Sequence, residues 1–94
     1  MIKSWKHKGL KDLFLTGSKK GIRPDIAERL LRRLDVLDAT NSLEALGLPG
    51  FRLHPLSGKM KGRYSIRVTR NWRLTFRFKD GDVFEVDLED YHGT

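Results

Sequence analysis

The 94-residue sequence contains no cysteine. Disulfide bridges, thiolate nucleophiles and zinc sites built on thiolates are therefore excluded. Its three histidines show no metal-ligand spacing, so we expect neither a metal nor another cofactor. No apolar run approaches the roughly 20 residues that span a bilayer. The basic start of the chain lacks the apolar core of a signal peptide, and we therefore expect a cytoplasmic protein without a membrane partner.

Acidic residues are few relative to basic ones. The chain has 19 Lys and Arg against 12 Asp and Glu, a net charge of +7. Such an excess favours a polyanionic partner, of which nucleic acid is the commonest. An acidic protein or an anionic membrane surface are the alternatives, and a basic protein that is merely soluble would show the same excess.

Helical patterns fill the first half of the chain and strand patterns the second, which predicts an α+β fold. Residues 2–6 form a possible short strand. Three helices are expected, over residues 10–17, from Pro24 to Leu37, and over residues 41–47. From Phe51 onward apolar and polar residues alternate, which predicts four strands that share one apolar face against the helices.

The predicted architecture is therefore one domain, residues 1–94. Its N-terminal helices pack on one face of a largely antiparallel sheet of about four to five strands.

The register of this sheet follows from its hydrophobic pattern. A three-residue loop at residues 80–82 sets Phe78 beside Phe84 and Arg73 beside Glu89, and keeps like faces together. A two-residue loop would set Phe76 against Glu85 and mix the faces. We therefore predict the three-residue loop, with Arg77 opposite Glu85.

The same reasoning at residues 69–71 places Arg67 beside Arg73. Continued outward, it brings Arg52 to Arg67 and His54 to Ser65. One row of the polar face would then read Arg52, Arg67, Arg73 and Glu89, where three arginines meet one carboxylate. A solvated face with cross-strand ion pairs is the alternative, but the arginine excess favours an anion site.

The remaining candidate residues surround this row. His54 lies on the polar side of its strand, and the loop over residues 56–62 adds Lys59 and Lys61 as possible phosphate contacts. The chain ends in Asp90-Tyr91-His92, before Gly93 and Thr94. Parity places Tyr91 on the polar face opposite Asn71, whereas Asp90 and His92 fall on the apolar side. They reach the polar face only if the strand twists or ends at Asp90. The alternative is that Asp90 has a structural role and caps the sheet edge. His7 is expected to be a surface residue.

A resemblance covers nearly the whole chain. It includes the start, Met1-Ile2-Lys3-Ser4 with Lys6-His7-Lys8-Gly9-Leu10 and Leu13-Phe14, and four later segments. They are His54-Pro55-Leu56-x-Gly58, Tyr64-Ser65-Ile66-Arg67-Val68, Asn71-Trp72-Arg73-Leu74-Thr75-Phe76 and the terminal Asp90-Tyr91-His92. Together they resemble the HigB toxins of bacterial toxin–antitoxin modules, members of the RelE/ParE superfamily.

The resemblance implies a RelE-like fold and a ribosome-dependent messenger-RNA endonuclease that cleaves codons in the A site of the 30S subunit. It also implies neutralisation by a HigA-like antitoxin with a helix-turn-helix domain. The implied active-site residues are His54, Arg73, Asp90, Tyr91 and His92, and Arg67 and nearby lysines are implied RNA contacts. Some family members carry a lysine at the position of Ser57, a contact that Lys59 or Lys61 could replace.

These residues suit metal-free RNA cleavage, because histidine serves as acid or base near neutral pH and arginine binds phosphate oxygens. Tyr91 would stack on or hydrogen-bond a base. Two further functions remain open. ParE-like relatives inhibit DNA gyrase without cleaving RNA, and a nucleic-acid-binding module would bind without catalysis.

Overall fold

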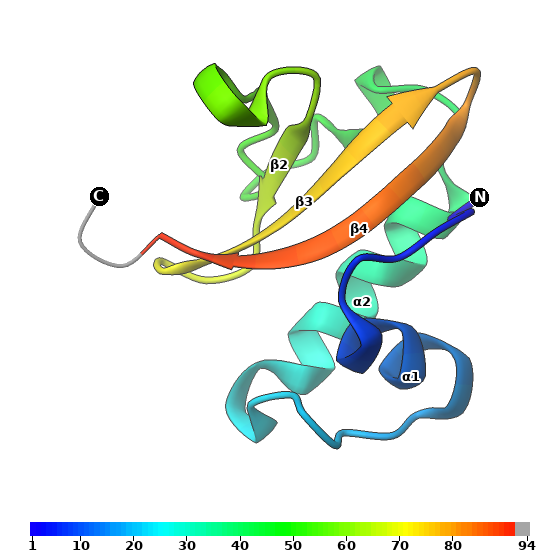
Figure 1. Cartoon of the computed structure of the whole chain (residues 1–94), viewed down its shortest axis with the longest axis vertical. Helices are drawn as coiled ribbons and strands as arrows, with labels where there is room; N and C mark the ends of the chain where they lie inside the picture. The colour runs from blue at the N-terminus through cyan, green and yellow to red at the C-terminus, as the bar shows by residue number, and fades with distance from the viewer. Residues whose placement is uncertain (92–94) are drawn as a thin grey trace.

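The computed structural model describes residues 1–91. Helix α1 (Lys8–Thr16), helix α2 (Pro24–Ala39) and the 3-10 turn η1 (Glu44–Leu46) precede the sheet. The sheet elements are β1 (His54–Pro55), the 3-10 turn η2 (Gly58–Met60), β2 (Tyr64–Arg67), β3 (Trp72–Lys79) and β4 (Asp82–Asp90). Figure 1 shows α1 and α2 on one side of the sheet and η2 on the other. The predicted α+β architecture is confirmed.

The two helix boundaries that the sequence marked with glycine and proline are confirmed. α1 stops at Gly17, whose left-handed backbone (φ 79°) lets its amide donate to the Leu13 carbonyl at 3.0 Å. α2 begins with Pro24 in its first turn. His7 differs from the prediction, because it is half-buried and its Nδ1 accepts from the Leu10 amide at 3.1 Å. It caps α1 and is not a simple surface residue.

The core lies between the helices and the sheet. From α2 it takes the apolar stripe of Ile26, Ala27, Leu30, Leu34 and Leu37, and from the sheet Ile66, Val68, Leu74, Phe76, Val83 and Val86. Leu31 of the same helix is only partly buried. None of the helices within residues 1–91 is both long and apolar enough to cross a membrane.

The sheet is antiparallel in the order β1-β2-β3-β4. The predicted pairing of β2 with β3 is confirmed, with Tyr64 opposite Phe76 and Arg67 opposite Arg73. The predicted step from β1 to β2 is confirmed at His54 opposite Ser65.

The predicted three-residue loop between β3 and β4 is wrong. Lys79 pairs with Asp82, so only Asp80 and Gly81 form the turn, and both have positive φ (52° and 84°) as a type I′ hairpin requires. Phe78 consequently pairs with Val83, and Arg77 with Phe84.

A β-bulge then corrects the mismatch between faces. Thr75 pairs with Asp87 while Arg77 pairs with Phe84, so Glu85 and Val86 together oppose Phe76. Glu85 adopts a left-handed conformation (φ 52°) at the bulge. Beyond it Leu74 pairs with Leu88 and Arg73 with Glu89, as predicted. Because of this bulge, β4 delivers its last residues to the faces that the hydrophobic pattern requires.

Candidate active site

The polar face of the sheet carries a cross-strand row of charges. Arg67 on β2 lies opposite Arg73 on β3, which lies opposite Glu89 on β4. Arg52 does not extend the row as predicted: it lies outside β1 in a left-handed conformation (φ 49°), and the Arg67 amide donates to the Phe51 carbonyl instead. The row therefore sets two arginines beside one carboxylate.

Arg73 holds the least satisfied polar group of this row. Its Nε and Nη1 atoms are buried and have no hydrogen-bond partner among residues 1–91. The guanidinium carbon lies 5.0 Å from the centre of the Tyr91 ring, a cation–π contact. Buried donors without acceptors are costly, and a bound anion would remove that cost. Arg73 is thus built to receive acceptor oxygens.

His54 stands at the edge of the same face, on β1. Its Nδ1 lies 3.1 Å from the Pro55 carbonyl oxygen and its Nε2 3.4 Å from the Ser65 hydroxyl. A carbonyl oxygen only accepts, so these contacts favour the tautomer with the proton on Nδ1. The Nε2 lone pair then accepts from Ser65 and remains the basic atom of the ring.

Arg63 is a functional candidate that the sequence did not single out. Its side chain is only 4% exposed. Nη2 donates to the Thr75 hydroxyl at 3.0 Å and to the Glu85 carbonyl at 2.7 Å, and the Thr75 hydroxyl donates to the Glu89 carboxylate at 3.4 Å. The alternation of apolar and polar residues does not indicate that this arginine is buried. This buried chain of hydrogen bonds links the bulge to the carboxylate beside Arg73.

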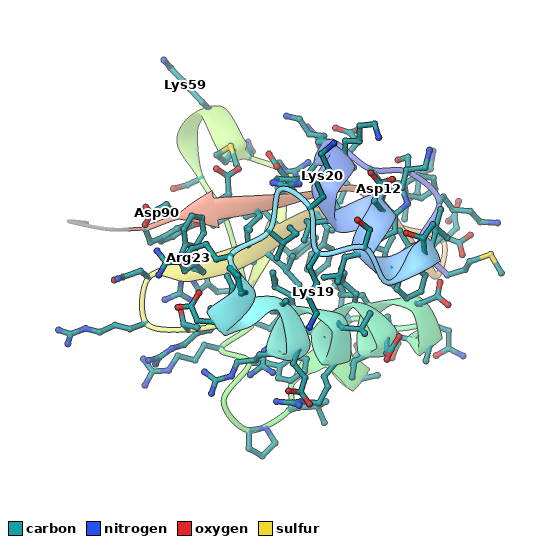
Figure 2. The ribbon with its side chains drawn as sticks, turned by 90° about the horizontal axis from the view of Figure 1, so that it is seen from below. Asp12, Lys19, Lys20, Arg23, Lys59 and Asp90 are labelled. Carbon is teal, nitrogen blue, oxygen red and sulfur yellow. The ribbon has the colours of Figure 1, made fainter. Side chains whose placement is uncertain are left out.

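The two described residues of the C-terminal trio, Asp90 and Tyr91, belong to opposite faces of the sheet. The Tyr91 amide donates to the Asn71 carbonyl at 2.6 Å, as predicted, and its ring joins Arg73 on the polar face. Asp90 pairs with Trp72, a residue of the opposite face. Figure 2 shows it beside Arg23 at the start of α2, where Asp25 and, more weakly, Asp90 raise the pKa of Arg23. His92 lies outside the described residues.

A pocket of about 290 Å³ connects η2 with the end of β4, and is lined by Met60, Glu89, Asp90 and Tyr91. Lys59 and Lys61, the predicted phosphate contacts of this loop, are exposed. Lys59 projects into solvent from η2 in Figure 2. Within residues 1–91 no three His, Asp or Glu side chains converge as a metal site.

Comparison with known proteins agrees with this geometry. Residues 3–92 match the family model described as the RelE-like toxin of the type II toxin–antitoxin system HigB. The chain is 44% identical to the endoribonuclease HigB of Proteus vulgaris over 92 residues, which cover 98% of this chain and all of that one. It is 32% identical to toxin HigB-1 of Vibrio cholerae, over 97% and 98% of the two chains.

A crystal structure of a YafQ mutant from E. coli shares the fold. It superposes with a TM-score of 0.65 at 22% sequence identity and covers 96% of this chain and 91% of its own. The family model spans almost the whole chain, and both curated relatives match end to end. The chain therefore belongs to the HigB-like family of RelE-like toxins of type II toxin–antitoxin systems.

Proposed function

We propose that this toxin is a ribosome-dependent endoribonuclease that cleaves translated messenger RNA in the A site of the 30S subunit. The observation that carries the proposal is the Arg73 guanidinium, whose buried Nε and Nη1 lack acceptors within residues 1–91, on the same face as His54. The name of the Proteus vulgaris relative, an endoribonuclease at 44% identity, supports the same reaction.

In the proposed reaction the ribose 2′-oxygen attacks the adjacent phosphorus, and the bond from phosphorus to the 5′-oxygen breaks. His54 Nε2 takes the 2′-hydroxyl proton, a role that suits the lone pair facing Ser65. Arg73 donates to the phosphoryl oxygens as their charge grows. His92 returns a proton to the 5′-oxygen, and Asp90 orients or stabilises the histidine. The products are a 2′,3′-cyclic phosphate and a 5′-hydroxyl, and no metal ion takes part.

The surrounding residues hold the RNA. Tyr91, half-buried next to Arg73, stacks on or hydrogen-bonds a base beside the scissile phosphate. Arg67 contacts the backbone from β2, Arg52 contacts it from the segment before β1, and Lys59 and Lys61 contact it from the η2 loop. The protein acts in the cytoplasm, and a HigA-like helix-turn-helix antitoxin neutralises it.

Primer extension on messages from bacteria that express the chain tests this function. We expect 5′ ends within translated codons, their loss when the start codon of the reporter message is removed, and their loss with His54→Gln at equal protein levels. Intact messages during growth arrest, together with DNA damage, would instead identify a ParE-like inhibitor of DNA gyrase. RNA binding without cleavage at any ribosome concentration would identify a binding module.

A further inference from the structure

Two arginines of α2 reach across to the end of β2. Arg33 Nε donates to the Arg67 carbonyl at 2.7 Å, and its guanidinium carbon lies 4.8 Å from the centre of the Phe51 ring. Arg29 Nη1 donates to the Val68 carbonyl at 3.4 Å. These bonds hold two guanidinium groups beside Arg67 and close to the turn that carries exposed Arg70. We call Arg29, Arg33, Arg67 and Arg70 the arginine ridge.

The ridge lacks compensating charge. None of its four arginines forms an ion pair with any residue from 1 to 91, whereas neighbouring Arg32 pairs with Glu28 at 3.5 Å. Burial, and then the charges of Arg29 and Arg32, lower the pKa of Arg33. Like charges held this close repel one another, so the positive potential of the ridge favours the binding of anions.

The ridge is continuous with the candidate active site on one side only. Arg67 belongs both to the ridge and to the row that includes Arg73. On the other side of Arg73, β4 presents Asp87 and Glu89 on the same face of the sheet. Figure 2 shows nitrogen-tipped side chains gathered between α2 and the turn that follows β2. A polyanion bound at Arg73 therefore meets cations toward α2 and carboxylates along β4.

We propose that the arginine ridge binds the phosphate backbone of the single-stranded RNA that flanks the scissile phosphate, so that the strand leaves the site over the β2–β3 turn and α2 and not along β4. This inference rests on the proposed RNA cleavage. Single-stranded RNA fits better than an acidic protein segment, because the ridge continues directly from the donors proposed to hold the scissile phosphate. Four guanidinium groups along such a path match a repeating row of phosphates.

The test measures binding without cleavage. The probe is a fluorescent RNA oligonucleotide that is 2′-O-methylated throughout and so has no attacking hydroxyl. Its Kd is measured against salt concentration for the full-length chain, for the double variant Arg29→Gln with Arg70→Gln, and for a control with Lys3→Gln and Lys11→Gln. Both doubles remove two positive charges, but Lys3 and Lys11 lie on the N-terminal segment and on α1, neither of which contributes to the ridge.

We expect the ridge variant to bind more weakly and to lower the slope of log K against log salt by about 1.4, since each phosphate contact on a single strand contributes about 0.7. The control should keep the wild-type slope to within about half of one contact. Ultraviolet cross-links of the same probe should fall on peptides from α2 and the β2–β3 turn, and near β4 only at Tyr91. If Arg29→Gln unfolds the chain, Arg70→Gln alone should still lower the slope by about 0.7.

Equal slopes for the ridge and control variants, or cross-links confined to β4, would overturn the inference. Equal slopes are also the result expected if the ridge binds an acidic segment of the antitoxin and not RNA. The result is independent of catalysis. A chain that binds the probe through the ridge but leaves messages intact would refute the proposed cleavage and keep the ridge. Cleavage of messages, together with a wild-type slope in the ridge variants, would support the proposed cleavage and refute the ridge.

Discussion

At the scale of single residues, Arg73 carries the site. Its buried Nε and Nη1 donors, which lack acceptors within residues 1–91, destabilise the folded state until an anion accepts hydrogen bonds from them. Arg73→Lys keeps the positive charge but loses the planar fork that binds two oxygens at once. We expect single-turnover RNA cleavage on ribosomes to fall by about 10²–10³-fold, comparable to the loss of one donor to a developing oxyanion.

The same substitution should leave the midpoint of thermal unfolding unchanged or higher, because it removes donors that lack acceptors. The matched control is Arg77→Lys on the same strand, where Arg77 is partly exposed and pairs with Glu85 at 3.5 Å. The control should cleave at nearly the wild-type rate. A wild-type rate of cleavage by Arg73→Lys would show that the Arg73 guanidinium is not needed for the reaction.

At the scale of elements, the bulge in β4 decides what reaches the site. Without it, the two-residue hairpin would continue regularly and set Leu88 opposite Arg73 in place of Glu89. Arg63 supports the bulge, because its Nη2 donates to the Glu85 carbonyl at 2.7 Å and its Nη1 lies 3.6 Å from the Glu85 carboxylate. A strained, left-handed Glu85 persists because its surroundings fix it.

Arg63→Met tests this support. The substitution keeps an apolar stem of similar length but leaves the Glu85 carbonyl and the Thr75 hydroxyl without their donor. We expect a loss of about 3 kcal/mol in the free energy of unfolding measured with urea. Arg77→Met removes a half-exposed partner of the same carboxylate, and should cost less than about 1 kcal/mol. Equal losses in the two variants would show that Arg63 contributes no more than a surface ion pair.

The elements also show what the sequence could predict. The register of β2 with β3 follows from alternation alone, because both strands run without interruption. The hairpin at Asp80-Gly81 was misjudged because alternation was assumed to continue through β4, whereas one extra residue at Glu85 shifts the phase. The burial of Arg63 was equally hidden, since its side chain is held by Thr75 and Glu85, which lie 12 and 22 residues further along the chain. The local alternation of residues predicted the row of Arg67, Arg73 and Glu89, whereas the contacts of Arg63 that support this row depend on the tertiary structure.

At the scale of the whole molecule, the N-terminal segment closes the free edge of β4. Residues 2–6, predicted as a short strand, form two parallel bridges, Ile2 with Val83 and Trp5 with Val86. The Lys3 amide donates to the Val83 carbonyl at 2.7 Å, and the Ser4 hydroxyl accepts from the Glu85 amide at 2.8 Å. Figure 1 shows this segment running beside β4. An uncovered edge strand would offer its amides and carbonyls to another chain.

Lys3→Pro should open this edge, because proline has no amide hydrogen to donate to Val83. We expect a loss of about 1–3 kcal/mol in the free energy of unfolding, together with concentration-dependent self-association in sedimentation experiments. Lys3→Ala is the matched control: the Lys3 side chain is exposed, so alanine should leave both stability and the wild-type state of association unchanged. Because β4 carries Glu89 and Tyr91 to the site, the proline variant should also lose RNA cleavage in step with its unfolding. A proline variant as stable and monomeric as the alanine variant would show that the sheet holds β4 without its N-terminal cover.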